Sequence, residues 1–303
     1  MNSVLVTGAS GFIGRQCLAL LQSRGYEVHA ISRRHLEWPA SKNLYWHEIG
    51  LLVPGTCAAI ISDVKPKLLL HLAWSAVPGE FWSASENLDW VRASLELLTA
   101  FTQCNGQRFV AAGSCTEYSW TAGECTEYCA LSEQTSLYAT CKSALGRILS
   151  SWAATTELNY GWARIFHLYG PFEHPSRLVA YAVRNLLQGR PVSCSSKDSI
   201  HDFSHVEDVA SALVALLEAE VRGPVNIGSG NPISVGEVFS EIGRQLGRSE
   251  LIHFSADDQA SKNIRIWANT ERLTREVGWS ARYDLHNGIE QTIRWWQANI
   301  ADA

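Results

Sequence analysis

Short apolar runs alternate with amphipathic stretches along the first half of the chain. Apolar residues recur at helical spacing between residues 13 and 23 and again between residues 88 and 98, which predicts a helix in each place. Four segments are apolar along most of their length and predict buried strands: residues 3–8, 27–32, 67–74 and 108–114. Strands of this kind that alternate with helices indicate a parallel sheet covered on both faces.

The regularity loosens after residue 164, and the pattern there fits a smaller, mixed lobe. Residues 205–220 and 225–230 predict one more helix and one more strand, which return to the sheet. Near the C-terminus a stripe of apolar residues about four apart predicts the packing face of a helix: Leu285, Ile289, Ile293 and Trp296.

Composition limits the class of protein. The chain has 303 residues, of which 46% are hydrophobic and 18% charged, which is typical of a globular protein. The net charge of −5 gives no basic field that would attract nucleic acid or an anionic membrane surface. The apolar runs are too short to span a bilayer, and the first residues show no signal peptide. We therefore expect a cytoplasmic protein without nucleic-acid or membrane partners.

Eight cysteines raise the question of disulfides or a metal site. Four of them fall close together in the sequence, at Cys115, Cys125, Cys129 and Cys141, but no pair has Cys-x-x-Cys spacing. A cytosolic chain keeps its thiols reduced. We expect reduced, partly buried thiols and no metal.

A glycine-rich turn, TGASGFIG, follows the first predicted strand and opens the first predicted helix. Gly8, Gly11 and Gly14 allow a tight turn and a close approach to a pyrophosphate, toward which the helix N-terminus then points. We therefore predict an α/β fold, a Rossmann-type doubly wound parallel sheet with a smaller mixed α/β C-terminal substrate lobe. The expected division is a dinucleotide-binding domain at residues 1–167, with 201–229 returning to it, and a substrate-binding lobe at residues 168–200 and 230–303.

The segment SLYATCK places Tyr138 and Lys142 four positions apart. Residues at this spacing are neighbours on a helix surface, so both side chains would face the same way. A nearby ammonium favours the ionised phenol and would pull the tyrosine pKa down toward the working range of a proton donor. The pair alone is weak evidence, because two ordinary helix residues would give the same pattern.

Three motifs occur in order along the chain: TGxxGxxG at the first turn, Ser-x-x-x-Tyr after a later strand, and Tyr-x-x-x-Lys on the next helix. Together they resemble the extended short-chain dehydrogenase/reductase family, whose members are mostly nucleotide-sugar epimerases, dehydratases and reductases. The resemblance therefore implies a nucleotide-diphosphate sugar as substrate. It covers essentially the whole chain, because it continues through HLAW (71–74), RIFHLYGP (164–171), HDFSHVEDVA (201–210), VNIGSG (225–230) and LTREVGW (273–279).

The resemblance implies a role for each motif residue. The matching tyrosine, Tyr138, exchanges a proton with the substrate oxygen while the nicotinamide exchanges a hydride with the carbon. Lys142 holds the nicotinamide ribose and lowers the tyrosine pKa. Ser114, four residues before Tyr118, hydrogen-bonds the same substrate oxygen, with Thr116 as the alternative.

The end of the second predicted strand bears on the choice of cofactor. Folds selective for NAD usually place an acid about 20 residues past the glycines, where it bonds the ribose 2′-OH. This chain has the sequence SRR at residues 32–34, and guanidinium groups suit a 2′-phosphate, so we expect NADP(H). With the contacts that the resemblance implies, the expected cofactor-binding residues are Gly8, Ser10, Gly11, Phe12, Ile13, Gly14, Ser32, Arg33, Arg34, Leu72, Ala73, Trp74, Ala112, Tyr138, Lys142, Ile165, Phe166 and His167.

The reactions of the family differ in the residues that they need. The 4,6-dehydratases carry an acid one or two positions after the catalytic Ser or Thr, where this chain has Cys115 and Thr116. Some 3,5-epimerase/reductases use a cysteine two residues before the closing tyrosine and a histidine after Gly-Pro. Here Cys115 is out of register by one, although His174 follows the Gly-Pro pair.

A Ser-x-x-Glu-Tyr arrangement looks more like that of the 4-keto-6-deoxy-sugar reductases, which need only hydride, tyrosine and serine. We expect NADPH to reduce the keto group of a nucleotide-linked 4-keto-6-deoxy sugar. A 4-epimerase or 3,5-epimerase/reductase is the alternative, ahead of a dehydratase. A non-catalytic NADP-binding regulator is the alternative of a different class.

Two departures from the family pattern affect the substrate site. His201 stands where an arginine usually reaches the substrate diphosphate, and His167 stands where an asparagine is common. If His201 replaces that arginine, Arg177 or Arg265 supplies more of the phosphate binding. Trp120 and other tryptophans beside the motifs are candidates for walls of the sugar pocket. The expected substrate-binding residues are Trp74, Trp82, Ser114, Cys115, Thr116, Tyr138, His167, Arg177, His201 and Arg265.

The predicted helices around residues 86–104 and 135–157 concern assembly. They resemble helices that form a four-helix dimer interface in these enzymes. We therefore expect a homodimer.

Overall fold

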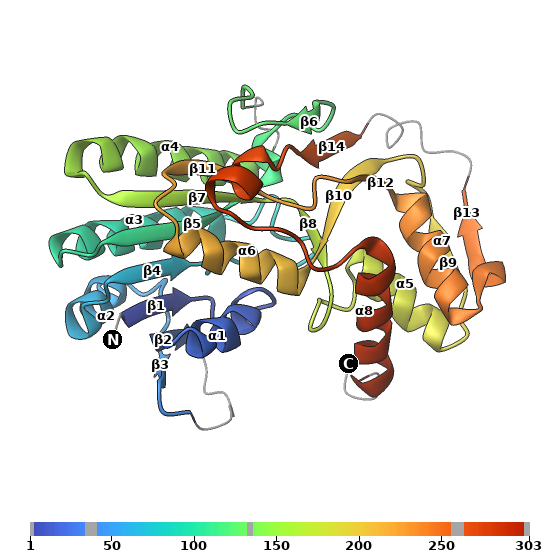
Figure 1. Cartoon of the computed structure of the whole chain (residues 1–303), viewed down its shortest axis with the longest axis horizontal. Helices are drawn as coiled ribbons and strands as arrows, with labels where there is room; N and C mark the ends of the chain where they lie inside the picture. Colours follow the sequence, from blue (N-terminus) through green and yellow to red (C-terminus); the bar gives the residue numbers. More distant parts are fainter. Residues whose placement is uncertain (1–2, 34–40, 132–135, 256–263, 300–303) are drawn as a thin grey trace.

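The computed structural model describes residues 3–33, 41–131, 136–255 and 264–299 (Figure 1). Its main sheet has seven parallel strands in the order β11-β7-β5-β4-β1-β2-β3. Strand order reverses on the two sides of β1, which is the point where doubly wound sheets bind ligands. The predicted doubly wound sheet is confirmed. Its strands are β1 Ser3–Thr7, β2 Glu27–Ser32, β3 Leu44–Glu48, β4 Leu68–His71, β5 Arg108–Ser114, β7 Asn159–Ile165 and β11 Gly223–Ile227.

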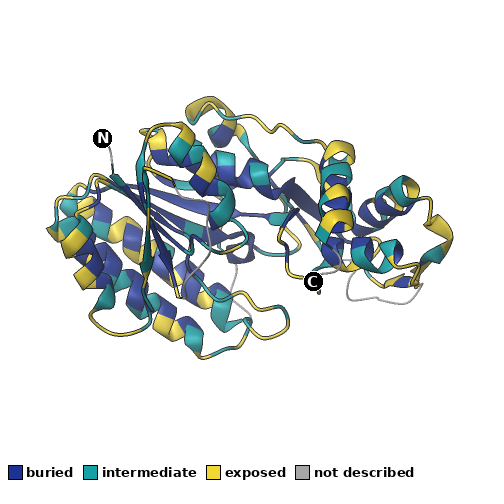
Figure 2. Cartoon of the chain, turned by 90° about the horizontal axis from the view of Figure 1, so that it is seen from below, coloured by how far each residue is buried: buried dark blue, intermediate teal, exposed yellow. Residues whose placement is uncertain are grey.

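Helices cover both faces of this sheet. On β1, Val4 and Val6 pack toward one helical layer and Leu5 toward the other. Successive side chains of a strand point to opposite faces, so an apolar strand is buried on both sides. Figure 2 shows these strands as a buried layer between the helices. One layer contains α1 Gly14–Ser23 and α6 Val206–Glu218, and the other contains α2 Thr56–Val64, α3 Glu86–Gln103 and α4 Leu137–Thr156.

The rest of the chain forms a smaller mixed α/β unit beside the main sheet (Figure 1). The stripe predicted from Leu285 to Trp296 packs into its core, as expected for the buried face of a helix. Its helices are α5 Leu178–Leu187, α7 Val235–Leu246 and α8 Leu285–Asn299. Its strands are β6 Gly123–Cys125, β8 His167–Tyr169, β9 Val192–Cys194, β10 Ile200–His205, β12 Pro232–Ser234, β13 Ile252–Phe254 and β14 Arg265–Ala268.

Asp202 on β10 ties this unit to the loop after β11. Its buried carboxylate accepts hydrogen bonds from the backbone N–H groups of Ser229 at 2.7 Å, Gly230 at 2.9 Å and Ala268 at 3.2 Å. These bonds fix the position of β10. Its partner β8 carries His167, a residue of the candidate site.

Two findings bear on membranes and metals. In the described part of the chain, no helix has the length and apolar character needed to cross a membrane. The residues that the structure describes also contain no group of three His, Cys, Asp or Glu side chains that could hold a metal ion. The eight cysteines are free thiols.

Candidate active site

The glycine turn after β1 is packed so closely that it excludes larger residues. Gly8 has φ +67°, and a Cβ on it would lie 2.8 Å from the backbone nitrogen of Ala73. A Cβ on Gly14 would lie 2.1 Å from the carbonyl oxygen of Gly8. Ile13, the N-cap of α1, provides no side-chain cap. The turn therefore brings the N-terminus of α1 to the sheet edge as a cradle for an anion.

Residues at the ends of β4 and β2 extend this cradle. The backbone N–H groups of Leu72 and Ala73 donate to the Thr7 hydroxyl at 3.1 and 3.2 Å. The Ser32 hydroxyl donates to the Ser10 hydroxyl at 3.3 Å. Arg33 follows Ser32 and is exposed, whereas Arg34 lies outside the described residues. The residues present fit a dinucleotide that runs from the glycine turn to the end of β2.

Three residues predicted to be catalytic converge where β5 ends and α4 begins. Tyr138 and Lys142 lie one turn apart on α4, and the Lys142 Nζ lies 5.9 Å from the Tyr138 ring centroid. The Ser114 hydroxyl is near enough to the Tyr138 phenol to oppose the rise in its pKa. Lys142 donates to the Ala112 carbonyl oxygen at 2.8 Å, so β5 positions both Ser114 and Lys142. The Ser114 hydroxyl also accepts from the N–H of Thr116 at 3.2 Å and from its hydroxyl at 3.0 Å.

Burial controls the protonation of this site. It raises the pKa of Tyr138 to about 12, although the Ser114 hydrogen bond and the positive charge of Arg177 oppose the shift. It lowers the pKa of Lys142 to about 7, against the opposing negative charge of Glu117. The groups that oppose this rise do not include Lys142, so the expectation that Lys142 lowers the tyrosine pKa stays a prediction. The phenol is protonated at neutral pH.

A buried charge pair supports the end of β5. Glu117 is 1% exposed, and its carboxylate accepts from the Ser114 N–H at 2.9 Å and from the Arg164 Nε at 3.1 Å. It also accepts from the Trp162 indole at 2.9 Å. Glu117 thus holds the backbone of Ser114 in place from beneath.

Aromatic rings surround the Tyr138 phenol. The ring centroids of Trp74, Phe81 and Trp82 lie 6.3, 4.8 and 6.0 Å from that of Tyr138, each nearly perpendicular to it. Trp82 in turn lies 5.9 Å from Trp120. We call these five rings the aromatic wall. It confirms no role by itself, but it places Trp74, Trp82 and Trp120 around the tyrosine, and it adds Phe81, which the sequence analysis did not single out.

His167 and His201 lie next to the aromatic wall, in contact with Trp120. Their ring centroids are 4.4 Å apart, and Trp120 meets both edge-on at 6.3 and 6.4 Å. The Nδ1 atom of each ring is buried without a hydrogen-bond partner. Burial lowers the pKa of His167 to about 3 and that of His201 to about 4, so both are neutral at pH 7.

The two candidate arginines lie in different settings. Arg177, the N-cap of α5, donates to the Ala76 carbonyl oxygen at 3.1 Å. Its positive charge acts on both Tyr138 and His167, which places it beside the site. Arg265 is exposed on β14, and within the described ranges no side-chain hydrogen bond or ion pair joins it to the other predicted residues.

Cys115 and His174 occupy settings that do not suit a reactive pair. Cys115 packs in a buried cluster with Tyr118, Cys125 and Phe166, and burial raises its thiol pKa well above the usual range. The thiolate needed for proton transfer is therefore disfavoured. His174 is exposed and bonds the Ser176 hydroxyl at 2.9 Å.

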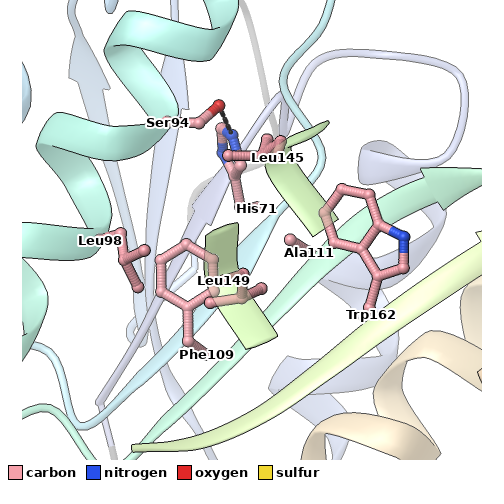
Figure 3. A pocket seen from close by; sticks show the side chains of 8 residues that line it. All are labelled: His71, Ser94, Leu98, Phe109, Ala111, Leu145, Leu149 and Trp162. Atoms are coloured by element: carbon pink, nitrogen blue, oxygen red, sulfur yellow. Dashed lines mark hydrogen bonds between the residues drawn. The ribbon is translucent and has the colours of Figure 1, made fainter. Parts of the chain in front are cut away.

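A small cavity lies beneath α3 and α4, between these helices and the strands β4, β5 and β7 (Figure 3). Its two polar side chains are His71 and Ser94, and they bond each other at 2.8 Å. The imidazole also contacts the Thr7 hydroxyl at 2.7 Å. Its polar groups are thus paired internally, so we assign it to packing. The lining residues are His71, Ser94, Leu98, Phe109, Ala111, Leu145, Leu149 and Trp162.

Comparison with known proteins places the chain in a family. The sequence profile of the NAD dependent epimerase/dehydratase family matches residues 4–228. The chain belongs to this family of enzymes. Its homologues are nucleotide-sugar epimerases and dehydratases of the extended short-chain dehydrogenase/reductase class.

Individual relatives are more distant. The chain is 22% identical to a UDP-glucuronate 4-epimerase of Thermodesulfobacterium geofontis, covering 99% of this chain and 98% of that protein. It is 24% identical to the CDP-abequose synthase of Salmonella typhimurium, covering 96% and 97%. Among solved structures, MoeE5 in complex with UDP-glucuronic acid and NAD superimposes with a TM-score of 0.84 at 28% identity, covering 98% of this chain and 100% of MoeE5.

Proposed function

We propose that the chain uses NADPH to reduce the keto group of a nucleotide-linked 4-keto-6-deoxy sugar. The observation that carries the proposal is the phenol of Tyr138, which burial keeps protonated beside the Ser114 hydroxyl. A protonated phenol suits a donor to a keto oxygen, whereas an oxidation of the sugar would begin with a phenolate.

Each residue has one task in this mechanism. The hydride would come from a nicotinamide dinucleotide held at the glycine turn and the end of β2. Tyr138 donates its proton to the substrate oxygen, and Ser114 donates a hydrogen bond to the same oxygen. Lys142, held by the Ala112 carbonyl, contributes to the ribose site. Arg177 serves the diphosphate, because it is a cation placed beside both Tyr138 and His167.

The second candidate is a 4-epimerase, which the similarity to UDP-glucuronate 4-epimerases favours. The same tyrosine and serine would serve it, with the cofactor reoxidised in each cycle. A 3,5-epimerase is less well supported, because the Cys115 thiol is buried and its pKa is raised.

One screen separates the two candidates. The chain would be incubated with NADPH and 4-keto-6-deoxy sugars linked to GDP, CDP, UDP or dTDP, and the absorbance of the reduced cofactor followed. Stoichiometric loss of NADPH supports reduction. In a parallel incubation with NAD⁺ or NADP⁺, interconversion of UDP-glucose or UDP-glucuronate with their 4-epimers and no net change in cofactor would replace it with epimerisation. Absence of both activities would favour the NADP-binding regulator.

Further parts of the proposal concern the cofactor, the assembly and the division of the chain. NADP(H) is supported by Ser32 and Arg33 at the end of β2. A homodimer is supported by exposed apolar side chains on α3 and α4. We also place the protein in the cytoplasm, and we assign residues 1–167 with 201–229 to the dinucleotide and the remainder to the substrate.

A further inference from the structure

A cation lies in the first turn of α1, directly after the glycine turn. Arg15 follows Gly14, and its Nη2 atom donates to the Ser10 carbonyl oxygen at 3.2 Å. The helix dipole makes this end of α1 positive, so it favours acidic side chains in the first turn and disfavours cations. Residues 14–17 of that turn include no acidic side chain. The placement of Arg15 is therefore unfavourable by itself, and it suits a chain that binds an anion at this end of the helix.

The guanidinium also has no counter-charge of its own. Among the described residues, no carboxylate forms an ion pair with Arg15, and its buried Nε makes no hydrogen bond. Burial lowers the pKa of Arg15, and the part of the chain that the structure describes contains no acid that opposes this shift. Charges removed from water are normally paired in proteins, and buried donors are normally hydrogen-bonded. Arg15 departs from both rules.

A strained residue in the segment after β8 holds the guanidinium in place. The Arg15 Cζ lies 3.9 Å from the centroid of the Phe172 ring, which in turn contacts Trp295 on α8 with ring centroids 4.7 Å apart. Phe172 has φ +69°, a left-handed backbone conformation that bulky residues rarely adopt. Strain of this kind is concentrated at ligand sites. The stack fixes the direction of the Arg15 side chain, but an aromatic ring has no net charge to neutralise it.

The glycine turn is the anion-binding feature beside this cation. Ser10, whose carbonyl oxygen Arg15 binds, lies within the turn, where Gly8 and Gly14 pack too closely for any Cβ. A dinucleotide in this cradle places its pyrophosphate at the N-terminus of the first helix. A guanidinium presents a planar fork that matches phosphate oxygens. Arg33, by contrast, follows β2, where the 2′-phosphate would lie.

We propose that Arg15 binds the pyrophosphate of the dinucleotide and that Phe172 positions its guanidinium for this contact. The inference rests on the proposed function, because it requires a nicotinamide dinucleotide in the glycine turn. It adds a side chain to the cofactor-binding residues that the sequence motifs indicated. The pyrophosphate is common to NADH and NADPH, so Arg15 contributes equally to both, whereas Arg33 distinguishes them.

The first test is a binding measurement that does not require turnover. The chain is titrated in a calorimeter with NADH, with NADPH and with adenosine 2′-monophosphate, which lacks the pyrophosphate. Arg15→Met keeps a long stem over Phe172 but removes the charge. It should weaken NADH and NADPH by the same factor, roughly 10- to 100-fold, as expected when a charge-assisted hydrogen bond is lost. The affinity for adenosine 2′-monophosphate should not change.

The stability of the chain without ligand separates binding from packing. Arg15→Met should melt at or above the temperature of wild type, because it removes an unpaired cation from the positive end of α1. A residue that only packs against Phe172 would instead lower the melting temperature and leave both dinucleotide affinities unchanged. Thermal unfolding followed by circular dichroism measures the difference.

Further variants locate the effect. Arg15→Lys keeps a positive charge and should recover part of the affinity. Phe172→Leu should weaken both dinucleotides less than Arg15→Met does, and it should have no further effect on affinity in the Arg15→Met background, because it acts through the guanidinium. Arg24→Met is the matched control, since Arg24 lies at the opposite end of α1 and pairs with Glu218, and it should leave both affinities unchanged.

Each outcome has a defined consequence. Unchanged affinity for both dinucleotides in a folded Arg15→Met variant overturns the inference. A loss confined to NADPH also overturns it and assigns Arg15 to the 2′-phosphate, and an equal loss for all three ligands shows a general disturbance of the cradle instead. If Arg15→Met does not fold, Arg15→Gln takes its place under the same criteria. NADPH oxidation with a keto sugar is assayed separately on wild type, so a failed inference leaves the proposed reduction standing. Failure of wild type to bind either dinucleotide would remove both proposals.

Discussion

At the scale of single residues, the site depends on how burial distributes protons. Tyr138 stays protonated because the rings around its half-buried side chain desolvate the phenol, and Lys142 is only partly charged near neutrality because its ammonium is buried. The spacing of the two residues along α4 can be read from the sequence. Their protonation cannot, because it depends on Trp74, Phe81 and Trp82, which come from another part of the chain.

Replacing the phenol tests the division of labour. Tyr138→Phe keeps the ring contacts but removes the proposed acid, so kcat should fall by roughly 10²- to 10⁴-fold. Ser114→Ala should reduce kcat less, because one hydrogen bond is lost and the acid remains. Steady-state kinetics with the keto sugar that the screen identifies measures both effects. A Ser114→Ala defect larger than that of Tyr138→Phe would contradict the assignment of the acid.

We attribute the preference for NADPH over NADH to one exposed side chain. Arg33 follows Ser32 at the end of β2, where a guanidinium can bind a 2′-phosphate. Arg33→Ala should weaken NADPH binding by about 1.5–3 kcal/mol and leave NADH binding nearly unchanged. Fluorescence titration with the two cofactors checks this, with Arg294→Ala on the exposed side of α8 as a control. Equal wild-type affinity for NADH and NADPH would contradict the NADP proposal.

At the scale of elements, the sequence predicted best the strands that are packed against helices on both faces. The strands β1, β2, β4 and β5 are buried on both faces, so their apolar runs are continuous and their positions were predicted to within a few residues. The edge strand β3 is half exposed and shows neither a continuous nor an alternating pattern, and it was not predicted. The three- and four-residue strands of the smaller unit are too short for periodicity to show.

The same limit applies to the site. The turn, the Tyr-x-x-x-Lys pair and Ser114 lie in local motifs, so the sequence alone could place them. The contact between His167 and His201 arises only when β8 pairs with β10. Glu117 belongs to the Ser-x-x-Glu-Tyr pattern, yet its role beneath Ser114 requires Arg164 and Trp162 from β7.

The segment that leads into α5 contains a buried carboxyl group, that of Glu173. Glu173 is 4% exposed, and burial raises its pKa from the usual 4.5 to about 8. The folded state therefore binds a proton that the unfolded state releases between these values. The contribution to stability is fully present below about pH 4.5 and is lost as the pH rises through about 8.

Glu173→Gln removes this titration. The variant should be more stable than wild type above pH 8, by on the order of a few kcal/mol, and the difference should shrink toward pH 5. Urea unfolding at pH 5, 7 and 9 measures the free energy of unfolding of both proteins. Glu290→Gln, an exposed carboxylate on α8, is the control. A stability difference that does not change with pH would show that Glu173 is not protonated in the folded protein.

At the scale of the whole molecule, α3 and α4 pack side by side and leave an exposed surface. Trp152 on α4 donates to the Thr102 hydroxyl on α3 at 3.1 Å. Leu88 and Ile148, one on each helix, are 58% and 42% exposed. Such side chains are candidates for burial against a second copy of the chain.

Solution mass tests that assembly. Wild type should scatter light as a dimer at micromolar concentration, and Ile148→Asp should shift it toward the monomer, because a carboxylate would be desolvated in the interface. Phe254→Asp is the matched control, since Phe254 is also 42% exposed but lies on β13, away from both helices. A monomeric wild type would end the dimer proposal.

The aromatic wall also has an optical consequence. Trp74 and Trp82 meet the Tyr138 ring, and Trp120 follows Trp82. Indole emission overlaps the absorption of a reduced nicotinamide, so a ring bound beside Tyr138 would accept excitation energy from these tryptophans. Exciting the protein and recording emission from the nicotinamide would then report when the reduced cofactor is seated, and the signal would vanish as the hydride leaves. The tryptophans that pack around the phenol would thereby act as intrinsic fluorescent donors that report on the reaction.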